Sequence, residues 1–157
     1  MVHLRPMTEA DFRAYLDFAV EDLAQQHVRA GNWHASEATP RAAALLQQML
    51  LDGRASEGHH LYSVVDEESG AKVGLIWLMV RYPGPHASLF VCDFWIFEPY
   101  RRRGFGTQTL LAVEEKAAGL GIDRIGLHVF AHNHAALALY QRAGYETTGL
   151  FMAKNLR

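Results

Sequence analysis

The chain has 157 residues, half of them hydrophobic and a fifth charged, with a formal net charge of −2 at pH 7. This composition excludes a disordered or fibrous chain, and the length fits a single compact domain over residues 1–157. The charge gives no overall basic field for nucleic acid, and the apolar stretch at residues 73–80 is too short to span a membrane. A single cysteine, Cys92, excludes an intrachain disulfide and favours a reducing compartment, so we expect a cytoplasmic protein.

The first part of the chain predicts one short strand and two helices. Residues 2–5 are strand-like, and Thr8 with Asp11 forms a capping box that opens a helix. Apolar residues then recur at helical spacing, namely Phe12, Leu16, Ala19 and Leu23. A second helix is predicted to begin with Thr39 as its N-cap and Pro40 as its first helical residue.

The middle of the chain alternates strands with turns and then a helix. Residues 61–66 and 72–81 predict a β-hairpin, and the apolar residues 88–97 predict a central strand that is covered on both faces. A helix follows from Gly106, and residues 124–130 return as a strand. Such a strand-helix-strand unit implies parallel pairing, with ligands at the carboxyl ends of the strands.

The end of the chain predicts a short helix and closing strands. The helix has one apolar face and is followed by Gly144, a residue that commonly ends a helix; the face consists of Ala136, Leu139, Tyr140 and Ala143. Residues 145–155 have the composition of one or two further strands. No internal repeat or linker interrupts the chain.

A segment rich in arginine and glycine lies where the strand at 88–97 leads into the next helix; it contains Arg101, Arg102, Arg103, Gly104, Phe105, Gly106 and Thr107. Two glycines allow backbone N–H groups to approach a phosphate at a helix N-terminus, and the arginines add forked donors. The segment lacks the Lys-Ser/Thr ending of a nucleotide P-loop and the third glycine of a dinucleotide motif. The residues therefore predict an anion site, and leave open a tight turn with solvated arginines.

The order Arg101-x-x-Gly104-x-Gly106 resembles the acyl-CoA pyrophosphate motif of the GNAT superfamily of N-acetyltransferases, in its bacterial form. Residues 93–100 are similar to that family's fourth strand, and residues 127–145 to its fifth strand and following helix. The resemblance implies an α/β, single-domain GNAT fold, with a mixed, mostly antiparallel sheet, flanking helices and a parallel, splayed pair at the central strands. It also implies acetyl-CoA as co-substrate, without a metal, and direct acetyl transfer in a ternary complex to a primary amine of a small molecule, peptide or protein.

The same resemblance implies roles for individual residues. Backbone groups of the fourth strand, from Phe94, Trp95 and Ile96, hold the pantetheine arm, although their side chains fit a plain core equally well. The arginine and glycine segment, from Arg101 to Thr107, holds the pyrophosphate. Asn133 contacts the coenzyme and is also a good helix N-cap. Tyr140 is the general acid that protonates the departing thiolate, and its helical stripe is equally compatible with packing.

The attacking amine must be neutral, so the reaction needs a proton acceptor. Asp93, among apolar residues, and His128, which titrates in a useful range, are the two candidates. Each is also compatible with a structural hydrogen bond. Cys92 in an apolar strand is expected to be inert, and no carboxylate or cysteine joins the histidines near His128 at metal-ligand spacing.

The sequence leaves two other functions and the acceptor open. A non-catalytic acyl-CoA-binding regulatory protein would keep the anion site without turnover, and a nucleic-acid module would need aromatic platforms that are not evident here. Glu21, His27 and Trp33 are the only suggested acceptor contacts, since no motif exists in that region. A homodimer is compatible with the sequence, but no pattern marks a face for it.

Overall fold

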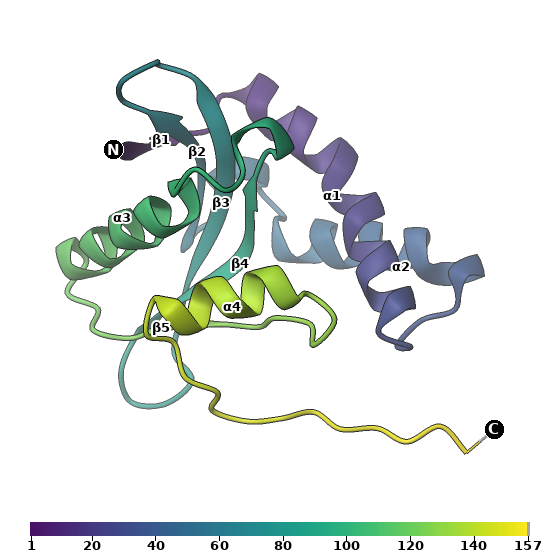
Figure 1. The fold of residues 1–157 in the computed structure, drawn as a ribbon. Helices are drawn as coiled ribbons and strands as arrows, with labels where there is room; N and C mark the ends of the chain where they lie inside the picture. The colour runs from purple at the N-terminus through teal and green to yellow at the C-terminus, as the bar shows by residue number, and fades with distance from the viewer. Residues whose placement is uncertain (157) are drawn as a thin grey trace.

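The computed structural model of the chain describes residues 1–156 and contains one mixed β-sheet with helices on both faces (Figure 1). The strands are β1 (Val2–Pro6), β2 (His59–Asp66), β3 (Lys72–Arg81), β4 (Ser88–Ile96) and β5 (Ile125–Leu127). The helices are α1 (Glu9–Arg29), α2 (Ala35–Met49), α3 (Phe105–Gly119) and α4 (His134–Arg142), with short 3₁₀ turns at Gly53–Ala55 and Glu98–Tyr100. No helix within residues 1–156 is long and apolar enough to cross a membrane.

The sheet follows chain order, β1-β2-β3-β4-β5, with every pair antiparallel except β4 and β5, which are parallel. The helices α1 and α2 cover one face of the sheet and α3 covers the other, each packed on its own buried cluster. The expected mixed α/β fold is therefore confirmed. The strand predicted to be central, β4, is fourth in the order, whereas β3 lies in the middle and has six consecutive buried residues.

The predicted start of the first helix is confirmed, and the predicted start of the second helix is wrong. Thr8 and Asp11 form the reciprocal capping box of α1, with both hydrogen bonds at 3.1 Å. The second helix begins at Ala35, one turn before the predicted N-cap Thr39, so that Pro40 lies inside α2. Pro40 has no N–H to donate to the Ser36 carbonyl, but both residues are exposed, so water can satisfy that carbonyl.

A β-bulge in β4 determines which residues face the site. Trp77 of β3 lies opposite Asp93, while the next residue, Leu78, lies opposite Val91, so Cys92 is an extra residue in β4. Side chains alternate between the faces of a strand, and one extra residue reverses that alternation. Val91 therefore packs with the α3 cluster, whereas Asp93 and the residues two and four positions further on face α1.

The end of the chain differs most from the sequence prediction. The strand predicted at residues 124–130 is paired with β4 only over Ile125–Leu127, and residues 128–130 belong to no strand. The closing strands expected in residues 145–155 are absent from the described structure, where residues 146–156 are exposed and form no helix or strand. The family's parallel pair is therefore present, but it lies at one edge of this sheet.

Candidate functional site

The strands β4 and β5 separate partway along β4. Their pairing ends at Val91 with Leu127, while β4 continues to Ile96. Beyond the bulge, the N–H of Phe97 donates to the carbonyl of Val73. In an antiparallel pair the hydrogen-bonded residues alternate with residues that are not bonded to each other, so the backbone N–H and C=O of Ile96, opposite Gly74, point away from β3. By the same alternation, the backbone groups of Phe94 also point away from β3, toward the edge of β4 that β5 leaves open, while the backbone groups of Trp95 face β3.

Two groups at this open edge are already bonded within the chain. The Phe94 N–H donates to the Asp93 carboxylate over 2.9 Å, and the Ile96 carbonyl accepts a 2.8 Å hydrogen bond from Arg101 Nε. The Arg101 guanidinium also lies over the Trp95 ring, 5.6 Å from its centroid. Arg101 thus ties the loop after β4 back to the strand.

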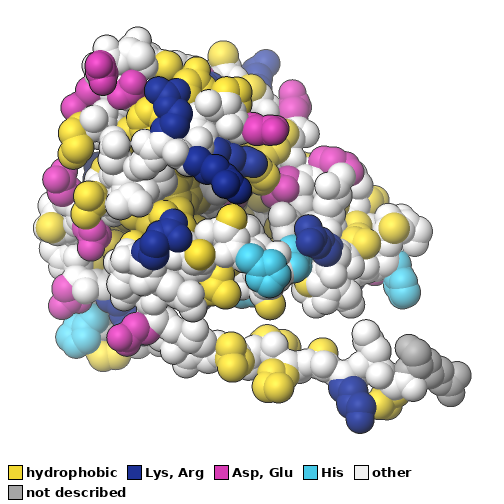
Figure 2. All heavy atoms as spheres, viewed as in Figure 1, with side chains coloured by type: hydrophobic (Ala, Val, Ile, Leu, Met, Phe, Trp, Pro, Cys, Tyr) yellow, Lys and Arg dark blue, Asp and Glu magenta, His cyan; other side chains and the backbone are white. Residues whose placement is uncertain are grey.

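The rest of the loop between β4 and α3 has the features of an anion-binding site at the start of α3. Arg102 and Gly104 adopt left-handed φ values of 60° and 84°, and no side chain caps the helix. Left-handed turns of this kind expose backbone N–H groups, and the first turn of a helix adds partial positive charge. The Arg103 guanidinium lies 5.2 Å from the Phe105 ring centroid, and Thr107 is exposed in the first turn. Figure 2 shows Lys and Arg side chains beside a hollow in this face.

Gly106 brings α4 against the start of α3. A Cβ at Gly106 would come within 3.0 Å of Leu139, so the glycine allows the two helices to approach closely. The neighbouring Tyr140 is buried, with its ring edge-on to Tyr145 at 5.6 Å. Burial, and then the charge of Asp93, raise the pKa of Tyr140, so its hydroxyl is protonated at neutral pH.

Asp93 lies opposite α1 and accepts a 2.6 Å hydrogen bond from the Tyr15 hydroxyl. Burial raises the pKa of Asp93 to about 6, even though the bonds from Tyr15 and from the Phe94 N–H favour the ionised form. The carboxyl can therefore gain or lose a proton near neutral pH. Tyr15 itself is buried, and burial together with the Asp93 charge raises its pKa.

The face of α1 that carries Tyr15 continues as a polar wall of the site. Asp22 is half-buried, and burial raises its pKa. Gln26 contacts His132 over 2.6 Å, which joins α1 to the loop before α4. Sequence reasoning missed Tyr15, Asp22 and Gln26. Their spacing of seven and four residues places them on one helical face and was the available signal.

The suggested acceptor contacts fall into two groups. His27 stacks on Trp33 at a 4.0 Å centroid distance and meets the edge of Phe130 at 5.2 Å, so both lie beside the loop before α4. Glu21 is exposed and accepts a 3.4 Å hydrogen bond from Gln25 on the same helix. The structure therefore brings His27 and Trp33 to the polar wall and leaves Glu21 outside it.

The other sequence candidates have simple structural settings. His128 is exposed just beyond β5, with its ring edge-on to Phe130 at 4.9 Å. Asn133 is the N-cap of α4 and accepts a hydrogen bond from the Ala136 N–H. Burial, and then the Asp93 charge, raise the pKa of Cys92 to about 12, so the thiol is a poor nucleophile. Residues 1–156 contain no cluster of three potential metal ligands.

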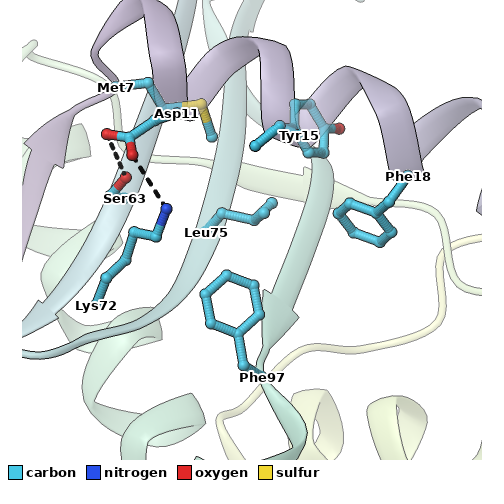
Figure 3. A pocket seen from close by; sticks show the side chains of 9 residues that line it. Met7, Asp11, Tyr15, Phe18, Ser63, Lys72, Leu75 and Phe97 are labelled. Carbon is cyan, nitrogen blue, oxygen red and sulfur yellow. Dashed lines mark hydrogen bonds and ion pairs between the residues drawn. The ribbon is translucent and has the colours of Figure 1, made fainter.

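A pocket of about 200 Å³ lies between α1 and the sheet and shares Tyr15 with the site (Figure 3). Phe18, Leu75 and Phe97 form its apolar wall. Its polar corner is closed, because Asp11 pairs with Lys72 at 3.0 Å and accepts from Ser63 at 3.3 Å. The pocket is thus an apolar extension of the site without a free reactive group.

The buried Asp93 carboxyl predicts a pH-dependent stability difference. Its pKa of about 6 exceeds the ordinary value of about 3.9, so the folded state holds a proton that the unfolded state has lost between these pH values. Stability from this group is therefore present at low pH and decreases as pH rises through 6. The difference in free energy of unfolding between Asp93→Asn and wild type should therefore shift by roughly 3 kcal/mol in favour of the variant when the pH is raised from 3 to 8.

Urea unfolding of both proteins at several pH values measures this difference. Asp17→Asn is a suitable control, since Asp17 lies on the same helix as Tyr15 but is exposed. A difference between wild type and Asp93→Asn that stays constant with pH would show that the Asp93 carboxyl titrates normally.

Comparison with known proteins agrees with this geometry. The sequence profile of the acetyltransferase (GNAT) family matches residues 21–145. The chain is 34% identical to YycN and 33% identical to YdgE, two uncharacterized N-acetyltransferases of Bacillus subtilis strain 168, covering 97–99% of each chain. The crystal structure of YycN superposes with a TM-score of 0.94 over 100% of this chain and 99% of that one.

A more distant structure shares the fold alone. AAC(6')-Iy, in complex with the bisubstrate analog CoA-S-monomethyl-acetylneamine, superposes with a TM-score of 0.59 at 15% identity, over 100% of this chain and 99% of that one. The family profile covers most of the present chain, and two relatives match it over nearly their whole length. The chain belongs to the acetyltransferase (GNAT) family and is an N-acetyltransferase.

Proposed function

We propose that this enzyme transfers the acetyl group of acetyl-CoA directly to a primary amine, with both substrates bound together. The observation that carries the proposal is the meeting of three parts at the split between β4 and β5. These parts are the uncapped start of α3, the protonated hydroxyl of Tyr140 and the titratable carboxyl of Asp93. The contact between Gly106 and Leu139 holds the first two together.

The residues at the start of α3 fit a pyrophosphate. Arg102 and Arg103 are exposed beside the free N–H groups of the first helical turn, which suits an anion with several oxygens. Arg101 bonds to the Ile96 carbonyl, so we assign it to shaping the loop and assign phosphate contact to its two neighbours.

The open edge of β4 fits the pantetheine arm, which carries amide groups. The Phe94 carbonyl and the Ile96 N–H point outward at this edge and have no partner within residues 1–156, so they can bond an extended ligand as a further strand would. Asn133, which caps α4 nearby, is a further proposed coenzyme contact. Trp95 contributes its side chain, packed against Phe18, because its backbone groups face β3.

The proton transfers can be assigned to two groups. The amine nitrogen attacks the thioester carbonyl carbon, and the carbon–sulfur bond breaks as the sulfur leaves with its electron pair. Asp93 takes the amine proton, directly or through water, and Tyr140 gives its proton to the sulfur. Asp93 suits the role of base better than His128, because it lies in the split beside Tyr140, whereas His128 is exposed and has no hydrogen-bond partner among the described residues.

The acceptor face supports an amine as substrate. The polar wall of α1 places Asp22 near Asp93, and carboxylates attract the positive charge that an amine carries before it reacts. His27 and Phe130 add an aromatic side to the same opening. AAC(6')-Iy, which shares the fold, is in complex with the bisubstrate analog CoA-S-monomethyl-acetylneamine, and this supports the proposal that both substrates bind together.

Release of free thiol from acetyl-CoA, measured against a panel of amines, amino acids, polyamines and peptides, tests the proposal. We expect release that depends on an acceptor and a new amide in the product by mass spectrometry. Binding of acetyl-CoA without turnover on any acceptor would favour the regulatory alternative. Failure to bind acetyl-CoA would overturn the proposal.

Replacing Tyr140 with phenylalanine should lower kcat by roughly 10- to 100-fold, because the leaving sulfur would have to take its proton from water. The affinity for acetyl-CoA, measured by calorimetry, should stay within about twofold, because the ring still packs. Tyr145→Phe is the matched control, since Tyr145 packs edge-on to Tyr140. Equal rates for Tyr140→Phe and wild type would exclude Tyr140 as the acid.

A further inference from the structure

Arg81, at the end of β3, forms no ion pair with a carboxylate within residues 1–156, where the five ion pairs involve other residues. The residue is exposed, and its guanidinium lies over the Phe90 ring, 4.3 Å from the centroid. Stacking on a ring uses the flat face of a guanidinium and leaves the N–H groups at its edge free to donate. Arg81 is therefore held in place with donors available to a ligand.

Phe90, which holds the Arg81 guanidinium, lies on the face of the sheet that carries Asp93. Its neighbours Leu89 and Val91 pack in the cluster beneath α3. Side chains alternate along a strand, so Phe90 points to the opposite face, the one that α1 and α2 cover in part. The free guanidinium is thus on the same side of the sheet as the proposed base.

The bulge in β4 brings Phe90 close to Asp93. Phe90 lies opposite Met79 and Asp93 opposite Trp77, so three steps along β4 match two steps along β3. The two positions are therefore roughly 7 Å apart along the sheet, as are alternate residues of a regular strand. The bulge thus places the Arg81 guanidinium, above Phe90, within the length of a small molecule from Asp93.

Positive and negative charges are separated on this face. At one end, burial and also the charge of Asp22 raise the pKa of Asp93, so the two carboxyls lie close together. At the other end, the Arg81 charge lowers the pKa of Cys92, against the larger effects of burial and of Asp93. Carboxyls attract an ammonium group, and a guanidinium attracts an anion. A ligand that carries both charges a few atoms apart complements both ends.

We propose that the acceptor is a free amino acid, with its amine at Asp93 and its carboxylate bound by the Arg81 guanidinium. This inference rests on the function proposed above and names the class of acceptor. A guanidinium presents two parallel N–H donors that match the two oxygens of a carboxylate. With hydrogen bonds of about 3 Å at both ends, only a few atoms can separate the amine from the carboxylate. A polyamine would instead bring a second positive charge to Arg81, which would repel it.

Acetyl transfer to amino acids and to their amides tests the proposal, because an amide keeps the size of the acceptor and removes the negative charge. Thiol release should give a kcat/KM for the best amino acid at least tenfold above the value for its amide and for putrescine. Turnover of amines with no preference for the carboxylate would overturn this inference and leave the proposed acetyl transfer intact. No turnover on any amine, amino acids included, would overturn both.

Variants of Arg81 separate substrate binding from a structural role. Arg81→Gln should raise the KM for the best amino acid by roughly 10- to 100-fold with little change in kcat, because Arg81 does not touch the reacting atoms. The kcat/KM for the amide and the affinity for acetyl-CoA in calorimetry should stay within about twofold. Arg13→Gln is the matched control, since Arg13 is 78% exposed and pairs with Glu9 on α1. Equal losses for the acid and the amide would show that Arg81 only supports the fold, which overturns the proposal.

Reversing the charge gives a result that loss of folding cannot imitate. Arg81→Glu should lower kcat/KM for the amino acid at least as far as Arg81→Gln does, and it should raise kcat/KM for putrescine, whose second ammonium would then meet a carboxylate. A variant that loses activity on the amino acid without any gain on putrescine would contradict a direct contact between position 81 and the acceptor.

Discussion

Replacing Gly74 with alanine is expected to lower the free energy of unfolding by roughly 3 kcal/mol. Gly74 lies in β3 opposite Ile96, where a Cβ would clash with the Trp95 carbonyl oxygen and come within 3.2 Å of the Ile96 Cα. Both contacts are with backbone atoms, so no change of rotamer relieves them. The strands β3 and β4 must move apart instead, and the movement displaces the half of β4 that lines the site.

The change at Gly74 should therefore affect function as well as stability. We expect weaker acetyl-CoA binding in calorimetry, alongside a lower midpoint in urea unfolding. Gly126→Ala in β5 is the matched control, since its Cβ would meet Phe90 and Ser88 only at 3.7 and 3.9 Å. That variant should stay within about 1 kcal/mol of wild type. Equal stability of the two variants would show that β3 and β4 are not closely packed at Gly74.

Replacing Asp93 with asparagine is expected to lower kcat/KM by roughly 10²- to 10³-fold, because asparagine cannot accept the amine proton. Asparagine keeps the size of the side chain and an oxygen for the bond from the Phe94 N–H. The split between β4 and β5 should therefore remain, and the affinity for acetyl-CoA should change little. His128→Gln is the matched control and should keep at least half of the wild-type rate.

The pH dependence separates a base from a positioning group. In wild type, kcat/KM should rise with pH through about 6 as Asp93 loses its proton and becomes able to accept one from the amine. The Asp93→Asn variant should lose this rise, while the Tyr140→Phe variant should keep it. If the rise disappears in His128→Gln and remains in Asp93→Asn, the histidine is the base.

Parts of the fold that depend on neighbours in the sequence could be predicted. The capping box at Thr8, the hairpin between β2 and β3 and the helix end at Gly144 follow from local backbone chemistry, and each is present. Pro40 is typical of a first helical residue and so predicts a start for α2 that is one turn later than the observed start at Ala35. Packing of Ala38 and Ala42 in a buried cluster with α1 overrides that local preference.

Features that depend on distant contacts could not be predicted. The candidate Asp93 was found from its residue type, but its partner Tyr15 lies 78 positions away and looked like one more helical residue. The bulge that turns Asp93 toward α1 has no sequence signature in β4, because apolar residues occupy both faces. The closing strands were expected from strand-like composition, and composition does not specify whether the partner strand belongs to the same chain.

Because Cys92 is an extra residue in β4, the orientation of the strand beyond it depends on the number of residues in β4 and not on which residue occupies position 92. Its side chain is half-buried and its thiol takes no part in the proposed chemistry, so serine or alanine can occupy the position. Deleting the residue would instead restore regular pairing with β3 and reverse the two faces of the strand beyond it. Asp93 and Trp95 would then point toward α3, away from Tyr15 and Phe18. In a lineage that keeps this site, substitutions at Cys92 are therefore tolerated and single-residue deletions are not.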